Sequence, residues 1–144
     1  MGFKGPWRRA ALVFACVATG AGILALHALL EMTPVPDPGE YFLTDLARAQ
    51  LGPLSISLAL LLAVALGFVW QVPPTVVGLS MVATFPLIAL YEATVFRGSY
   101  NLIPIEFAIV ALWSVPLMLA AAVGRWTARR LGRHDVWAGD SASP

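Results

Sequence analysis

The stretch LYEATVFRGSYNLIPIEF, from Leu90 to Phe107, decides the fold, because it joins two strongly apolar segments and carries charged side chains between them. Its ionisable residues are Glu92, Arg97 and Glu106, and they stand beside the polar residues Tyr91, Tyr100 and Asn101. A short polar connection between two long apolar segments is typical of a hairpin of membrane-spanning helices. The remaining apolar segments are expected to pack against this hairpin.

The composition is that of a membrane protein. Of the 144 residues, 59% are hydrophobic and 12% are charged, with a mean hydropathy of +0.79, whereas soluble domains are about 45–50% apolar and about 25% charged. No basic stripe with interleaved aromatic residues is present, which argues against nucleic-acid binding. The single cysteine, Cys16, excludes an internal disulfide and a CxxC site, and its apolar neighbours favour a buried hydrophobe. Alanine-rich helices and the dominance of arginine over lysine indicate a bacterial gene.

Four apolar segments are long enough to cross a membrane, since a helix that rises about 1.5 Å per residue needs about 20 residues for a core of about 30 Å. They are 10–30, 51–70, 75–96 and 103–123. The first exceeds the apolar core of roughly 7 to 15 residues in a signal peptide, which favours an uncleaved anchor. Pro86 and Pro116 are expected to interrupt the last two. Ala59, Ala63 and Gly67 form a small-residue stripe on the second, which favours close helix packing in lipid.

The polar segment 31–50 is expected to form an external loop with a short interfacial helix. Three prolines before residue 39 exclude a continuation of the first span. The motif Asp37-Pro38-Gly39-Glu40 is typical of a helix start, because its carboxylates can accept hydrogen bonds from unpaired backbone N–H groups. Phe42, Leu46 and Ala49 then share one face. This pattern predicts an amphipathic helix in the headgroup region.

The basic residues predict the orientation. Two of them, Arg48 and Arg97, fall on one side of the predicted membrane, and the other seven fall on the opposite side, at Lys4, Arg8, Arg9, Arg125, Arg129, Arg130 and Arg133. The positive-inside rule therefore places both termini in the cytoplasm. The segment 125–144 is expected to begin as a basic helical tail that binds anionic lipid. The predicted fold is an all-α, integral membrane four-helix transmembrane bundle, a single domain over residues 1–144 in the bacterial inner membrane.

Ionisable residues gather near the predicted external ends of the spans. Charged groups at membrane depth cost a few kcal/mol on insertion scales, so they are expected to face the interior of the bundle or a wet cavity. Topology brings residues from the first, third and fourth spans to a similar depth. We define the predicted polar cluster as His27, Glu31, Tyr91, Glu92, Arg97, Asn101 and Glu106.

Three roles for the polar cluster remain open. The favoured one is a structural clasp in which Glu92 and Glu106 share Arg97, while Asn101 caps the fourth span and Tyr91 donates a hydrogen bond, because intramembrane charges commonly pair. The second is binding and release of protons or a cation. The third is ligation of a metal that activates water, by His27, Glu31, Glu92 and Glu106, although the spacings match no zinc motif such as HExxH.

No catalytic motif is recognisable, since the serines in the spans lack a GxSxG pattern. We therefore expect a non-enzymatic subunit or scaffold of a membrane complex, with no cofactor and no bound metal. Its expected partners are the lipid bilayer and either helices of other membrane proteins or further copies of the chain. One alternative is a proton- or ion-coupled small transporter that acts as an oligomer. A membrane metal-dependent hydrolase is a further alternative.

Overall fold

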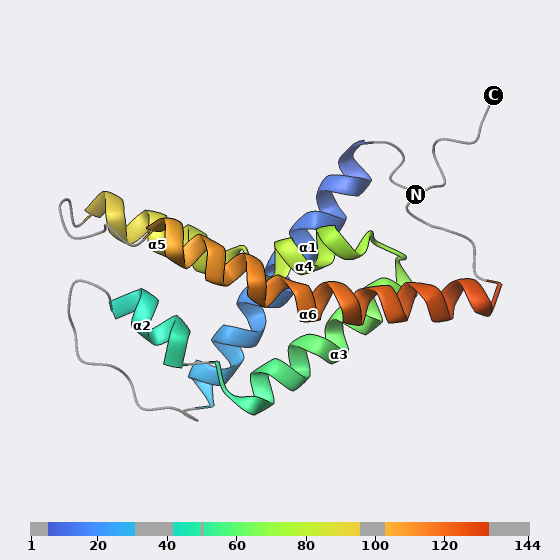
Figure 1. Cartoon of the computed structure of the whole chain (residues 1–144), viewed down its shortest axis with the longest axis horizontal. Coiled ribbons are helices and arrows are strands. Elements are labelled where there is room, and N and C mark those ends of the chain that lie inside the picture. The colour runs from blue at the N-terminus through green and yellow to red at the C-terminus, as the bar shows by residue number, and fades with distance from the viewer. Residues whose placement is uncertain (1–5, 31–41, 50, 96–102, 133–144) are drawn as a thin grey trace.

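The computed structural model describes residues 6–30, 42–49, 51–95 and 103–132, and this part of the chain is all-helical (Figure 1). The helix order is α1 (Pro6–Leu29), α2 (Phe42–Ala49), α3 (Pro53–Val69), α4 (Pro74–Val82), α5 (Thr84–Val95) and α6 (Ile103–Arg130). The long helix α6 runs across most of the view, with α3 along one half of it and α5 along the other. The short helix α2 lies at the α5 end of the molecule.

Three of the described segments are long and apolar enough to cross a membrane, namely 9–26, 74–95 and 107–130. A fourth is obtained if α2 and α3 count as one span that is bent by 83°. The helix α3 alone has 17 residues, fewer than the predicted span 51–70, because Pro53 starts the helix and it ends at Val69. The fold is therefore all-helical, with three or four candidate spans by length and composition.

The two prolines expected to interrupt spans act differently. Pro86 separates α4 from α5, since a proline ring clashes with the carbonyl four residues earlier, which belongs to Val82. The chain turns at Ala83, whose N–H donates to the Ser80 carbonyl at 3.3 Å in a tighter turn. Pro116 lies inside α6, which continues through it as one helix. The predicted interruption is confirmed at Pro86, whereas at Pro116 the helix is not divided.

The helix α6 extends beyond the predicted span 103–123 as far as Arg130, so the basic segment begins as a continuation of the same helix. The guanidinium of Arg130 lies 5.0 Å from the centre of the Trp126 ring, one turn earlier. Such a cation–π pair at a helix end is suited to a membrane interface.

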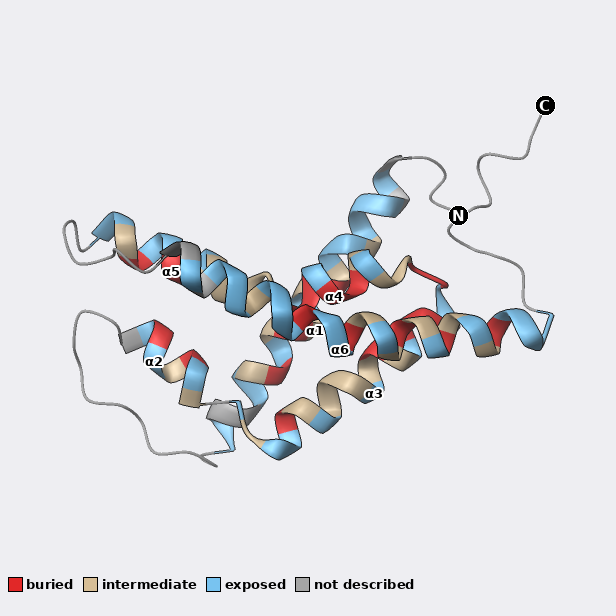
Figure 2. Cartoon of the chain, viewed as in Figure 1, coloured by how far each residue is buried: buried red, intermediate tan, exposed pale blue. Residues whose placement is uncertain are grey.

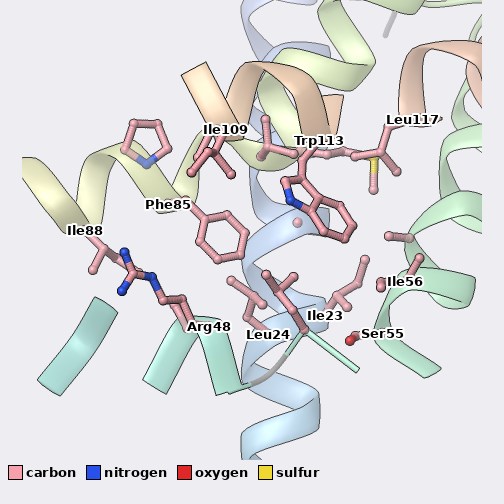
Figure 3. Close-up of a pocket in the computed structure, with 18 of the residues that line it drawn as sticks. Ile23, Leu24, Arg48, Ser55, Ile56, Phe85, Ile88, Ile109, Trp113 and Leu117 are labelled. Atoms are coloured by element: carbon pink, nitrogen blue, oxygen red, sulfur yellow. The ribbon is translucent and has the colours of Figure 1, made fainter. Parts of the chain in front are cut away.

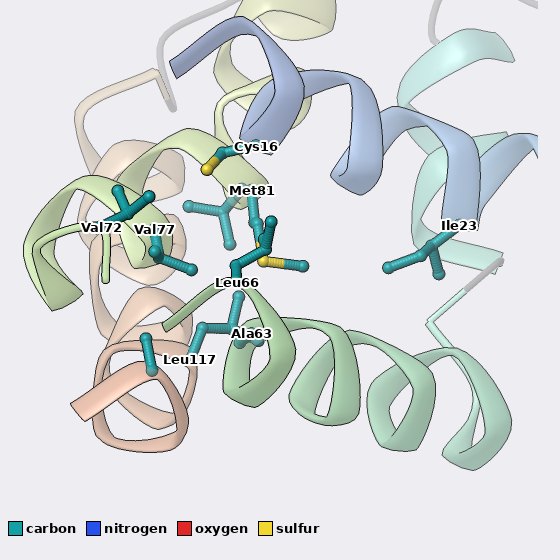
Figure 4. Close-up of a cluster of buried hydrophobic side chains, with 10 residues drawn as sticks. Cys16, Ile23, Ala63, Leu66, Val72, Val77, Met81 and Leu117 are labelled. Atoms are coloured by element: carbon teal, nitrogen blue, oxygen red, sulfur yellow. The ribbon is translucent and has the colours of Figure 1, made fainter. Parts of the chain in front are cut away.

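The core lies where α1, α3, α4 and α6 cross, and the outward faces of these helices are exposed (Figure 2). Met81 and Leu66 lie between Cys16 and Leu117 (Figure 4). Cys16 is completely buried, as its sequence surroundings predict. Buried residues recur every three or four positions along α6, at Ser114, Leu117, Ala121, Gly124 and Ala128. This repeat forms a seam that packs against α3 and α4.

Glycines allow the helices to approach within backbone contact. A Cβ atom built on Gly67 of α3 would overlap the Ala121 carbonyl oxygen, and one on Gly124 of α6 would overlap the Val64 carbonyl oxygen. Close packing of this kind replaces the hydrophobic effect as the force that joins helices in lipid.

The predicted small-residue stripe of α3 therefore has its partner within the same chain. Ala63 and Gly67 are buried at the contact with α6, and Ala59 lines a cavity described below. Close helix packing is confirmed at Ala63 and Gly67, where α6 covers the stripe.

Candidate functional site: a capped helix over an apolar cavity

The buried carboxylate of Glu92 caps the first turn of α2. Glu92 lies in α5 and is 2% exposed. Its Oε1 accepts the Leu43 N–H at 2.7 Å, and its two oxygens accept the Thr44 N–H at 3.3 and 3.2 Å. The Thr44 hydroxyl donates to Oε2 as well. These backbone groups belong to the second and third residues of the helix, where a cap side chain normally binds.

A carboxylate is suited to this position for two reasons. The first N–H groups of a helix have no partner within it, so an acceptor must come from elsewhere. The start of a helix also carries a partial positive charge, which stabilises an anion. Glu92 supplies both the acceptor and the negative charge, although it lies almost fifty residues away in sequence. The result is a buried contact that fixes α2 to α5.

The buried face of α2 differs from the predicted one. Thr44 and Ala47 are buried, at 7% and 5% exposure, whereas Leu46 and Ala49 are half-buried. The predicted short helix is confirmed as α2, and the headgroup contact expected of Phe42, Leu46 and Ala49 stays a prediction. The residues that α2 buries most deeply lie elsewhere on the helix because Thr44 turns toward Glu92. The predicted helix start at 37–40 lies outside the described residues.

Of the predicted polar cluster, the structure describes two side chains, Glu92 and Tyr91. Glu92 faces the interior, as membrane depth predicts, while Tyr91 is 59% exposed. The side chains of the other members lie outside the part that the structure describes, namely His27, Glu31, Arg97, Asn101 and Glu106. The clasp shared with Arg97 therefore stays a prediction. The contact between Glu92 and Thr44 had no signal in the sequence. The two residues are far apart along the chain, and no motif or periodic spacing links them.

A cavity of about 330 Å³ lies beside α2, and every one of the six helices contributes to its lining (Figure 3). The aromatic rings of Phe85 and Trp113 project into it, and Ile23 and Leu24 of α1 approach from another side. Ligand sites usually occupy roughly 300–1,000 Å³ and are mostly apolar with a few placed polar groups. The cavity matches this description in size and lining.

Three of the lining residues are polar, namely Thr44, Arg48 and Ser55. The Thr44 hydroxyl is bound to Glu92. The Ser55 hydroxyl accepts the Gly52 N–H at 3.0 Å and donates to the Gly52 carbonyl at 2.9 Å, which fixes the start of α3. Arg48 is the charged residue of the lining, and its guanidinium forms an ion pair of 3.7 Å with Asp45 on the exposed side of α2.

Within the described residues, no three His, Cys, Asp or Glu side chains come together in a group that could hold a metal ion. The metal ligands proposed from the sequence, apart from Glu92, lie outside this part of the chain. The site is thus a carboxylate-capped helix placed beside an apolar cavity. Comparison with protein-family models, curated proteins and solved structures finds no match for this chain.

Proposed function

We propose that the protein is a non-enzymatic four-span membrane protein that binds an apolar molecule in the cavity beside α2. In this proposal the bent pair of α2 and α3 counts as one span, and both termini are cytoplasmic. The helix α2 then lies at the external interface and covers the cavity. The observation that carries the proposal is the cavity itself, whose lining is drawn from all six helices and is almost entirely apolar.

The use of Glu92 supports a binding role over a catalytic one. All of its described hydrogen bonds hold α2 in place, so this carboxylate positions the helix that forms one wall of the cavity. A wall held by a buried, charge-assisted contact keeps a defined shape. Pre-formed shape is what a binding site for an apolar molecule needs.

Cavity filling tests the proposal. Ala59 lines the cavity, and Ala65 lies on the exposed side of the same helix. A hydrocarbon-chain ligand is added to delipidated protein, and the amount that stays bound is measured by native mass spectrometry. We expect Ala59→Phe to abolish this retention and Ala65→Phe to leave it unchanged. Equal retention by wild type and both variants would show that the ligand binds elsewhere, and the proposal would be wrong.

A proton- or ion-coupled transporter is a second candidate, favoured by the buried carboxylate of Glu92. It predicts that Glu92→Gln abolishes a pH-dependent flux in liposomes while expression stays normal. A flux that survives this substitution would exclude Glu92 as the coupling group.

A subunit or scaffold function stays a proposal that the cavity does not oppose. The outward side of α6 carries an apolar stripe at Ile105, Leu112, Leu119 and Val123, spaced by four or seven residues. Spacing of this kind is typical of helices that pair. Native mass spectrometry of mild-detergent extracts tests it, since a chain that is always a lone monomer would contradict it.

A further inference from the structure

We infer that the cavity takes one hydrocarbon chain of an anionic phospholipid, with the lipid phosphate bound at Arg48. The inference rests on the proposed function, because it names the ligand of the same cavity. Two separate observations carry it. The lining fits a hydrocarbon chain, and the charge at its edge fits a phosphate.

The first observation is the apolar character of the lining. Apart from the three polar residues on α2 and at the start of α3, the side chains that line the cavity are aliphatic or aromatic, or are glycine and proline. Cavities lined in this way do not hold ordered water and readily take up apolar molecules. In a protein that is surrounded by bilayer, the apolar molecule present in greatest excess is the acyl chain of a lipid.

The second observation is the chemistry of the polar lining. The hydroxyls of Thr44 and Ser55 already take part in hydrogen bonds that fix α2 and α3. Arg48 carries the charge of the lining, and its side chain is 57% exposed at the edge of the cavity beside Ile88 (Figure 3). Guanidinium has five N–H donors in a planar fork that binds phosphate with two parallel hydrogen bonds.

The existing ion pair does not prevent this contact. Arg48 and Asp45 are both more than half exposed and lie 3.7 Å apart, and exposed pairs of this kind contribute little free energy. A phosphate can therefore share the guanidinium at small cost. The carboxylate-capped start of α2 is fixed to α5, so α2 holds this arginine at one edge of the cavity. The aromatic ring of Trp113, which belongs to α6, lies inside the cavity.

The test uses the full chain, purified in detergent and delipidated. It is titrated separately with dioleoyl phosphatidylglycerol and with dioleoylglycerol, which has the same chains and no phosphate, and 1:1 adducts are quantified by native mass spectrometry. Wild type is expected to bind the anionic lipid about tenfold more tightly, the size of effect that one charge-assisted hydrogen-bonded contact gives. Arg48→Gln should remove this preference. Arg9→Gln, at an exposed arginine near the start of α1, should preserve it. Inorganic phosphate added in excess should not displace the lipid, because it has no chain.

The outcomes separate the inference from the proposed function. If Ala59→Phe abolishes lipid binding but Arg48→Gln leaves the preference for the anionic lipid intact, the cavity binds a chain and the role of Arg48 is wrong. If neither lipid binds in a manner that Ala59→Phe abolishes, both the inference and the proposed function are wrong. If free phosphate displaces the lipid, the site recognises an anion alone, and the inference is overturned.

Discussion

At the scale of single residues, Glu92 shows how a costly buried charge is stabilised without a cation among its described partners. Its carboxylate accepts two backbone N–H groups and one hydroxyl, all at the first turn of α2. Hydrogen bonds to a charged group are stronger than those between neutral groups. The charge is thus stabilised by the same groups that α2 itself cannot satisfy.

Replacing Glu92 with Ala is expected to release the start of α2 from α5. The N–H groups of Leu43 and Thr44 lose their acceptors, and an unsatisfied buried donor costs about 1–3 kcal/mol. Hydrogen–deuterium exchange of the purified protein should show faster exchange of these two amides, with little change in α3. Glu92→Gln keeps one acceptor oxygen and should give an intermediate effect.

The neighbouring Tyr91 supplies the control, because its side chain is 59% exposed on the same helix. Tyr91→Phe should leave amide exchange in α2 at the wild-type rate. If Glu92→Ala behaves in the same way as Tyr91→Phe, the carboxylate does not hold α2.

The sequence could predict part of this site. The depth of Glu92 near the end of a span predicts its burial, because an exposed carboxylate in lipid is costly. The identity of its partner could not be predicted, since the partner donors are mostly backbone N–H groups, which every residue except proline carries. The sequence also could not predict which face of α2 is buried. Thr44 is buried because it forms a hydrogen bond, whereas the apolar periodicity pointed to Leu46 and Ala49.

At the scale of helices, packing depends on small residues at the crossings. Gly67 of α3 and Gly124 of α6 contact backbone carbonyl oxygens of the opposite helix. The sequence shows the small residues on α3 because they recur every four positions. It does not show which helix they meet, since the seam of α6, from Ser114 to Ala128, is also built from small residues and could have met either neighbour.

Gly67→Ala is expected to destabilise the contact between α3 and α6. Its new Cβ would overlap the Ala121 carbonyl oxygen, so the helices must move apart. Overpacking of this kind costs about 1–3 kcal/mol. The free energy of unfolding in detergent, measured by steric trapping or by SDS titration, should fall by this amount.

Gly22 of α1 is the matched control. A Cβ built there meets nothing within 4 Å, and alanine is favoured over glycine in a helix by up to about 1 kcal/mol. Gly22→Ala should therefore leave the free energy of unfolding unchanged or raise it slightly. An equal loss in both variants would mean that the close contact at Gly67 is not the cause of the loss.

The prolines show a second limit of prediction at this scale. Each proline was expected to interrupt its span, and the local chemistry of the two is the same. Pro86 divides the helix pair α4 and α5 and sits in the first turn of α5, where a missing N–H costs nothing. Pro116 loses one hydrogen bond inside α6, but buried seam residues on both sides of it keep the helix continuous.

At the scale of the whole molecule, the number of spans follows from whether the bent pair α2 and α3 crosses the membrane. With four spans, both termini lie on the same side. With three, formed by α1, by α4 with α5, and by α6, the chain ends on opposite sides. The distribution of basic residues favours the first arrangement, because the basic end of α6 and the basic start of the chain should then both face the cytoplasm.

Cysteine labelling in intact cells tests this arrangement. In a Cys16→Ala background, single cysteines are placed at Asp45 in α2 and at Leu131 after α6, both of which are exposed. We expect a membrane-impermeant maleimide to label Asp45→Cys in intact cells and Leu131→Cys only after permeabilisation, because four spans return the chain to the cytoplasm. Labelling of both positions in intact cells would instead indicate three spans. In that case α3 would lie outside the membrane, and the cavity that α3 lines would lack the lipid surroundings on which its proposed ligand depends.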